Sequence, residues 1–163
     1  GKKSQAFPNF GVERSGAPIQ SFVRVSDKDI LSRDHVYNPD ILIIQDDSLI
    51  GKSNVFSGIK KSTLIIINSK EKLNNLFVKI KKEKDLPKNF SEKNILIVDA
   101  SKVALEIFKK NIVNTAILGT LAKVPNLLNL KAIFSAVEEK FQDKGREIIE
   151  KNILAIEHTY NLK

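Results

Sequence analysis

The stretch STLIIINS, residues 62–69, decides the fold of this chain. It is a short run of leucine and isoleucine that closes in an asparagine and a serine. Two similar runs flank it, DILIIQD at 40–46 and KNILIVDA at 93–100. Strands that are buried on both faces have this composition, because helices cover each side of a parallel sheet. The three runs therefore predict parallel strands at the centre of an α/β domain.

Outside these runs, the apolar residues recur at the spacing of an amphipathic α-helix. Residues 73–80 and 101–108 carry such stripes, and we expect Ser101 to be the N-cap of the second. The last third of the chain predicts two more helices, one on each side of Gly145. This alternation predicts a three-layer α/β/α sandwich with a mainly parallel, mixed sheet. No linker or repeat interrupts the pattern, so we expect a single domain over residues 1–163.

The N-terminal part reads QAFPNFGVERSGAPIQSFVRVSD, residues 5–27. A strand runs into a turn, and the segment PIQSFVRVSD then alternates apolar and polar residues, as a half-buried strand does. We expect a further partner strand within SDKDILSRDHV, residues 26–36. The sequence thus predicts an antiparallel hairpin near the start of the chain.

The turn between these strands is framed by Gly16 and Pro18 and exposes Glu13, Arg14 and Ser15. Backbone amides in a glycine-containing turn, a hydroxyl and a guanidinium suit a phosphate or pyrophosphate. An ion pair of Arg14 with Glu13 or another carboxylate, which would hold the turn in place, accounts for the pattern equally well.

Composition excludes several classes of site. The chain has 163 residues and no cysteine, so it cannot hold a disulfide, a thiolate-bound iron–sulfur cluster or a cysteine zinc site. His35 and His158 have no metal-ligand spacing. No apolar run approaches the ~20 residues that cross a bilayer, and no signal-peptide pattern is present, so we expect a cytoplasmic protein.

The formal net charge of +8 suggests nucleic acid, an anionic ligand or an acidic protein as a partner. Lysines gather in KIKKEKDLPK, residues 79–88, without the interleaved aromatics that single-strand binders use. We interpret this run as a solvated surface. Gly51, Lys52 and Ser53 resemble the end of a phosphate-binding loop, but Asp46 stands where that loop needs a glycine. A surface turn that opens a helix is expected there instead.

Three aspartates, Asp46, Asp47 and Asp99, follow the predicted strands, where capping and turn formation are their common roles. The segment NTAILGTLAK, residues 114–123, predicts a helix with small residues at every third position around Gly119. That face packs either on the domain's own sheet or on another chain, and the sequence leaves both open.

The N-terminal stretch resembles the signature of the gamma subunit, or gamma domain, of 2-oxoacid:ferredoxin oxidoreductases. Further landmarks of that family follow in the same order along the whole chain: YNPDILIIQD, VDAS, NIVNTAILGTLAK and EIIEKNILAIEHTY. Members of this family typically begin one βα unit earlier, so the resemblance implies that this domain is N-terminally incomplete.

The resemblance implies a complex that decarboxylates a 2-oxoacid on thiamine diphosphate with Mg²⁺. Electrons pass through iron–sulfur clusters to ferredoxin or flavodoxin, and coenzyme A takes the acyl group. It places those cofactors on other subunits, so this chain is not active alone, has no catalytic or metal-binding residue, scaffolds the complex and contributes to coenzyme A binding. Pyruvate is the favoured substrate because of Gly16-Ala17-Pro18.

By the same resemblance, the coenzyme A-binding residues are Glu13, Arg14, Ser15 and Gly16, and the subunit interface includes Asn114, Thr115 and Gly119. Two alternatives remain. One is a free-standing basic α/β domain that binds a nucleotide-like phosphate ligand, and the other is a nucleic-acid-binding module.

Overall fold

The computed structural model describes residues 2–9 and 19–162. At its centre lies a parallel sheet of three strands in the order β3-β4-β5. The strands are β3 (Ile41–Ile44), β4 (Leu64–Asn68) and β5 (Ile95–Val98). They coincide with the three apolar runs, so the predicted parallel strands and the α/β class are confirmed. Ile41 pairs with Leu64 and Ile65 with Ile95, which aligns the carboxyl ends of the strands.

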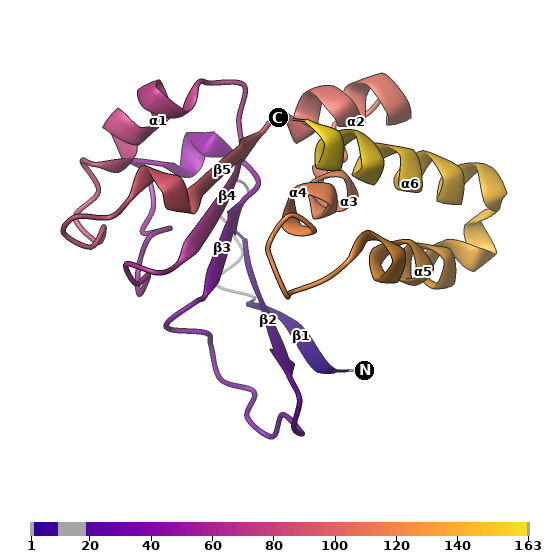
Figure 1. Cartoon of the computed structure of the whole chain (residues 1–163), viewed down its shortest axis with the longest axis horizontal. Coiled ribbons are helices and arrows are strands. Elements are labelled where there is room, and N and C mark those ends of the chain that lie inside the picture. Colours follow the sequence, from indigo (N-terminus) through magenta and orange to yellow (C-terminus); the bar gives the residue numbers. More distant parts are fainter. Residues whose placement is uncertain (1, 10–18, 163) are drawn as a thin grey trace.

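Helices cover both faces of this sheet (Figure 1). Helix α1 (Leu73–Ile80) lies on one face, and α2 (Ala100–Phe108), α3 (Val113–Ala116), α4 (Leu118–Leu121) and α6 (Arg146–Asn161) lie on the other. Helix α5 (Leu130–Phe141) packs against α6. Three short 3₁₀ turns complete the described elements: η1 (Asp47–Leu49), η2 (Glu92–Asn94) and η3 (Gln142–Lys144).

Neighbouring isoleucines of β4 pack in different cores, because side chains alternate between the two faces of a strand. Ile65 and Ile67 are fully buried in the cluster that contains Phe77 of α1. Ile66 is fully buried in the opposite cluster, with Val103 of α2. A strand that is apolar at every position is what such a two-sided core requires.

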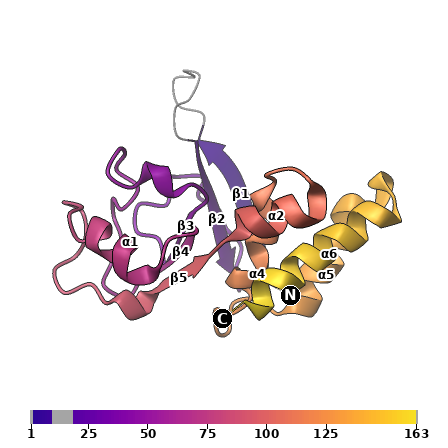
Figure 2. The same ribbon diagram turned by 90° about the horizontal axis from the view of Figure 1, so that it is seen from above.

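The antiparallel pair expected near the start is present as a sheet of its own. Strand β1 (Lys3–Asn9) pairs with β2 (Gln20–Ser26), from Lys3 opposite Ser26 to Asn9 opposite Gln20. Figures 1 and 2 show this hairpin as a ribbon separate from the three parallel strands. The residues that connect its strands, 10–18, lie outside the described ones.

Several local predictions were wrong. No strand forms within residues 26–36 beyond the end of β2, because most of these residues are exposed and gain no burial from pairing. The segment after Gly51 continues as turns through residue 58 instead of opening a helix. The predicted helix over 114–123 is divided into α3 and α4 at Ile117. Asp99, rather than Ser101, caps α2.

Candidate functional site

The predicted coenzyme residues, Glu13, Arg14, Ser15 and Gly16, lie outside the described residues. The structure does describe the strands on either side of them. Strand β1 ends at Asn9 and β2 begins at Gln20, and these two residues pair with each other.

The half-buried face of this hairpin carries two aromatic rings, and a third from the segment after β2 stacks on one of them. The rings of Phe7 and Phe22 lie 5.5 Å apart, and the imidazole of His35 stacks on Phe22 at 5.0 Å. Arg24 donates a hydrogen bond to the carbonyl of His35 at 3.1 Å, and its guanidinium lies 5.8 Å from the centre of the Phe7 ring. These contacts attach the segment that follows β2 to the hairpin, without a third strand.

Asn68, the last residue of β4, joins the carboxyl ends of the parallel strands. Its amide nitrogen donates to the carbonyl of Gln45 and to the hydroxyl of Ser101, both at 2.9 Å. Its oxygen accepts from the backbone N–H of Ser101 at 3.1 Å. The side chain therefore links β3, β4 and α2. Ligands commonly bind at this edge of an α/β sheet, but here both ends of the Asn68 amide are already paired within the chain.

Two of the three aspartates at this edge, Asp46 and Asp99, serve as caps, which is one of the predicted roles. The carboxylate of Asp46 accepts from the backbone N–H of Ser48 at 2.9 Å, and that of Asp99 accepts from Lys102 at 2.8 Å. Hydrogen bonds from the side chain and amide of Ser48, helped by the positive charge of Lys52, lower the pKa of Asp46. Asp47 accepts a hydrogen bond from the hydroxyl of Ser69. These contacts give the three carboxylates structural roles.

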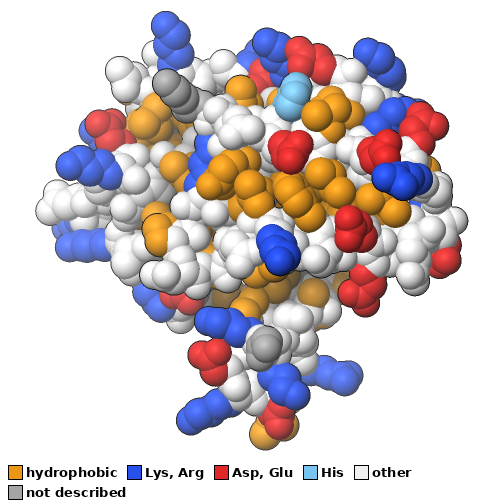
Figure 3. All heavy atoms as spheres, turned by 45° about the vertical axis from the view of Figure 1, so that its right-hand side comes forward, with side chains coloured by type: hydrophobic (Ala, Val, Ile, Leu, Met, Phe, Trp, Pro, Cys, Tyr) orange, Lys and Arg blue, Asp and Glu red, His pale blue; other side chains and the backbone are white. Residues whose placement is uncertain are grey.

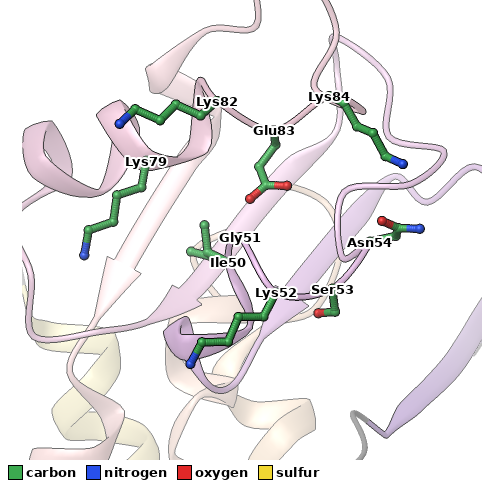
Figure 4. A pocket seen from close by; sticks show the side chains of 9 residues that line it. All are labelled: Ile50, Gly51, Lys52, Ser53, Asn54, Lys79, Lys82, Glu83 and Lys84. Carbon is green, nitrogen blue, oxygen red and sulfur yellow. The ribbon is translucent and has the colours of Figure 1, made fainter.

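Two features that are separate in the sequence meet in one open pocket (Figure 4). The turn that resembled a phosphate loop supplies one wall, and the end of α1 with the lysine run supplies the other. Gly51 adopts the left-handed conformation, with φ of +83°, at this turn. The nine lining residues are Ile50, Gly51, Lys52, Ser53, Asn54, Lys79, Lys82, Glu83 and Lys84.

The lining of this pocket contains four lysines and one glutamate, so it would attract a ligand or partner with spread-out negative charge. Figure 4 shows the lysine side chains around its rim, with the Glu83 carboxylate directed toward the turn. Lys79, a lining residue, forms an ion pair at 2.5 Å with Glu71, which does not line the pocket. The lining contains neither an arginine for bidentate phosphate binding nor an aromatic ring for a base. Sequence reasoning considered the two segments separately and missed that they share a pocket.

The three predicted interface residues lie in different surroundings. Asn114 is exposed and its side-chain oxygen accepts from the N–H of Thr115 at 2.9 Å, whereas Thr115 and Gly119 are buried. A Cβ atom at Gly119 would lie 2.0 Å from the carbonyl oxygen of Ile156. The small-residue position thus admits the backbone of α6 of the same chain, a helix rather than the sheet. Contact of this region with another chain stays a prediction.

The helical side of the molecule exposes several large apolar side chains. Figure 3, with that side turned forward, shows a band of hydrophobic side chains across the middle of the face. Large apolar residues of α2, α6 and the connecting segments that remain exposed are Leu105, Ile112, Leu128, Ile148, Leu154 and Tyr160.

Within residues 2–9 and 19–162, no three side chains of the metal-ligating types gather where they could hold an ion. In that same part of the chain, no helix combines the length and the hydropathy needed to cross a bilayer.

Comparison with known proteins gives consistent matches over almost the whole chain. Residues 1–162 match the family described as "Pyruvate ferredoxin/flavodoxin oxidoreductase". The chain is 37% identical over 161 residues to the "Pyruvate/ketoisovalerate oxidoreductases common subunit gamma" of Thermococcus kodakarensis, covering 99% of this chain and 81% of that one. It is also 37% identical over 162 residues to the "Pyruvate synthase subunit PorC" of Methanocaldococcus jannaschii, with 99% and 80% covered.

Two solved structures share the fold. The pyruvate oxidoreductase subunit PORC of Thermotoga maritima superposes with a TM-score of 0.75 at 28% identity, covering 98% of this chain and 79% of that one. The 2-oxoglutarate:ferredoxin oxidoreductase of Magnetococcus marinus, solved with 2-oxoglutarate, coenzyme A and succinyl-CoA, has a TM-score of 0.64 at 17% identity. That superposition covers 98% of this chain and 25% of the much longer Magnetococcus marinus chain.

Proposed function

Because this chain belongs to the pyruvate ferredoxin/flavodoxin oxidoreductase family, we propose that it is the gamma subunit of a 2-oxoacid:ferredoxin oxidoreductase complex. The observation that carries this proposal is the family match over residues 1–162, together with relatives named as gamma and PorC subunits, of which this chain covers 81% and 80%. The complex would oxidatively decarboxylate a 2-oxoacid to acyl-CoA.

Within such a complex, this chain would act as a scaffold and a coenzyme-binding part, while other subunits carry out the redox chemistry. A chain without cysteine cannot supply thiolate ligands to an iron–sulfur cluster. Thiamine diphosphate with Mg²⁺ and the clusters would therefore belong to partner subunits, and ferredoxin or flavodoxin would accept the electrons. Several relatives carry pyruvate in their names, which supports pyruvate as the substrate class.

We place coenzyme A at the segment that joins β1 to β2. Arg14 and Ser15 would donate hydrogen bonds to coenzyme phosphates, Gly16 would let the backbone approach them, and Glu13 would lie beside the site. A guanidinium and a hydroxyl in a glycine-containing turn have the chemistry that a pyrophosphate needs. A larger oxidoreductase that contains this fold was solved with coenzyme A bound, which makes coenzyme A a reasonable ligand to test.

The substitution Arg14→Ala in the assembled complex tests this assignment. A charge-assisted phosphate contact contributes on the order of 1.5–3 kcal/mol, so the apparent affinity for coenzyme A should fall roughly ten- to a hundredfold. Decarboxylation of the 2-oxoacid on thiamine, measured without coenzyme A, should stay near the wild-type rate. Steady-state kinetics of acceptor reduction against coenzyme A concentration gives the first quantity.

Arg33→Ala is the matched control, since it removes the same charge from an exposed arginine elsewhere in the chain. It should leave the dependence on coenzyme A unchanged. If Arg14→Ala behaves like this control, Arg14 does not contact the coenzyme.

The alternative is a free-standing basic domain that binds a nucleotide-like phosphate ligand, for which the lysine-rimmed pocket is the motivating feature. Native mass spectrometry of the protein purified from its own cells separates the two functions. Association with larger, cluster-containing chains in constant stoichiometry is expected for the gamma subunit. A homogeneous monomer that never acquires such partners would favour the alternative.

A further inference from the structure

The open pocket between the turn at Gly51 and the end of α1 brings together lysines that are far apart in the sequence. Lys52 comes from the turn, whereas Lys82 and Lys84 follow α1, and all three are exposed. The pocket has a volume of about 620 Å³, which lies within the ~300–1,000 Å³ of common small-molecule sites. The lysine run by itself indicated a solvated surface, but together with Lys52 it forms the wall of a cavity.

The positive charge around this pocket is not balanced by ion pairs within the described residues. Of the four lining lysines, only Lys79 takes part in a described ion pair, with Glu71. The other ion pairs found in residues 2–9 and 19–162 lie elsewhere. Ammonium groups that gather without counter-charges repel one another, and an anion placed between them relieves this repulsion.

Glu83 is the one carboxylate among the described lining residues. One of its oxygens would lie 3.9 Å from a Cβ atom at Gly51. Figure 4 shows this side chain directed toward the turn, with the lysine side chains spread around it. Because a single carboxylate faces four ammonium groups, the lining keeps an excess of positive charge. Glu83 itself should weaken the binding of an anion, which gives the inference a testable sign.

The polar backbone groups of the turn are already paired within the chain, unlike those of a phosphate-binding loop. The N–H groups of Lys52 and Ser53 donate to the carbonyl of Leu49 at 3.1 and 3.2 Å, and the hydroxyl of Ser53 donates to the same oxygen at 3.2 Å. Recognition of an anion would therefore rest on the lysine ammonium groups, which act as flexible point charges and impose little geometry.

We propose that this pocket binds a compact polyanion, through its charge alone. A linear oligophosphate and a small polycarboxylate share this chemistry, and the lining has no aromatic ring on which a base would stack. The proposal does not depend on the proposed function, because a gamma subunit and a free-standing domain would carry the same pocket.

Isothermal titration calorimetry of the full chain with inorganic tripolyphosphate tests the proposal. Saturable binding is expected at low ionic strength, and it should weaken as salt screens the exposed charges. Lys52→Gln removes a cation from one wall and Lys84→Gln from the other, and each should raise the dissociation constant roughly three- to tenfold. Glu83→Gln should lower the dissociation constant roughly twofold or more, because it removes the opposing charge.

Lys131→Gln is the matched control, since Lys131 is an exposed lysine of α5 outside the pocket lining. It removes the same net charge and should leave the dissociation constant near the wild-type value. If Lys131→Gln weakens binding as much as Lys52→Gln does, net charge rather than the pocket attracts the anion, and the proposal is wrong. Tighter binding that fails to appear in Glu83→Gln would also contradict it.

Two further ligands identify the chemistry that the pocket recognises. Citrate separates a polycarboxylate from an oligophosphate: binding of either at the pocket supports the proposal, and failure of both overturns it. ATP should bind no more tightly than tripolyphosphate, so much tighter binding of ATP would show recognition of a nucleotide instead. Nuclear magnetic resonance of the backbone amides should locate the shifts at Gly51 and Lys52. None of these outcomes decides the proposed function, which the native mass spectrometry tests separately.

Discussion

At the scale of single residues, Asn68 links β3, β4 and α2 at the carboxyl edge of the sheet. Its side chain is 6% exposed and makes three hydrogen bonds, which reach the end of β3 and the start of α2. An amide can serve as both donor and acceptor, so one residue satisfies a carbonyl, an N–H and a hydroxyl. The edge where α/β sheets usually bind ligands is therefore closed by an internal contact at this strand.

Replacing Asn68 with alanine should lower the free energy of unfolding by about 2–4 kcal/mol, because the N–H of Ser101 and the carbonyl of Gln45 would lose their partner in a buried place. Urea denaturation followed by circular dichroism measures this change. Asn94→Ala is the control, since half-buried Asn94 donates a single, exposed hydrogen bond to the carbonyl of Lys61 at 2.7 Å. A loss for Asn68→Ala no larger than for this control would mean that the network adds little stability.

At the scale of elements, the contact of α4 with α6 fixes how the C-terminal helices sit on the sheet. Gly119 of α4 lies so close to α6 that a Cβ atom would be 2.0 Å from the carbonyl oxygen of Ile156 and 2.7 Å from the N–H of Tyr160. Both atoms belong to the backbone and cannot rotate away. The hydroxyl of Thr159, on the same side of α6, donates to the carbonyl of Ala116 in α3. The close backbone contact with α4 and the buried hydrogen bond to α3 both hold α6 in its position.

We expect Gly119→Ala to lower the free energy of unfolding by about 3 kcal/mol or more, because overpacking against backbone forces the two helices apart. Ser135→Ala, on the exposed side of α5, should change it by less than about 0.5 kcal/mol. Thermal and chemical denaturation of the two variants side by side makes the comparison. Equal stability of the two would mean that α4 and α6 lie further apart than described.

The hairpin is the opposite case among the elements. It pairs well within itself and contributes no described residue to the buried clusters. Its described contacts outside the two strands include those of Phe22 and Arg24 with His35.

At the scale of the whole molecule, one sheet separates two cores. Consecutive residues of β4, Ile65 and Ile66, are both fully buried but face opposite layers. A defect in either layer should therefore weaken the same central strand. The two layers are expected to unfold as one cooperative unit.

Ile65→Ala and Ile66→Ala should each lower the free energy of unfolding by about 2–5 kcal/mol, because each leaves a cavity in a packed core. For both variants, far-ultraviolet circular dichroism and the tyrosine fluorescence to which Tyr160 of α6 contributes should report the same midpoint. The exposed Ile148→Ala is the control and should cost less than about 1 kcal/mol. Separate midpoints for the two probes would show that the layers unfold independently.

The sequence by itself determined the class of the fold, the three parallel strands and the family. Strands buried on both faces and amphipathic helices leave local patterns of composition and period, and a family signature is itself a pattern along the chain. It also anticipated that Asp46 would cap a turn, since an aspartate shortly after a strand commonly begins a turn or helix. For α2 it offered both Ser101 and Asp99, and the structure selects Asp99. The strand predicted within 26–36 does not form, because its residues have no surface on which to be buried.

Only the tertiary structure decided which distant residues meet. Asn68 reaches Ser101 across 33 positions, the turn at Gly51 shares a pocket with Lys82, and Gly119 admits α6 from the end of the chain. Contacts of this kind depend on strand order and on how closely helices pack, and the local spacing of residues determines neither.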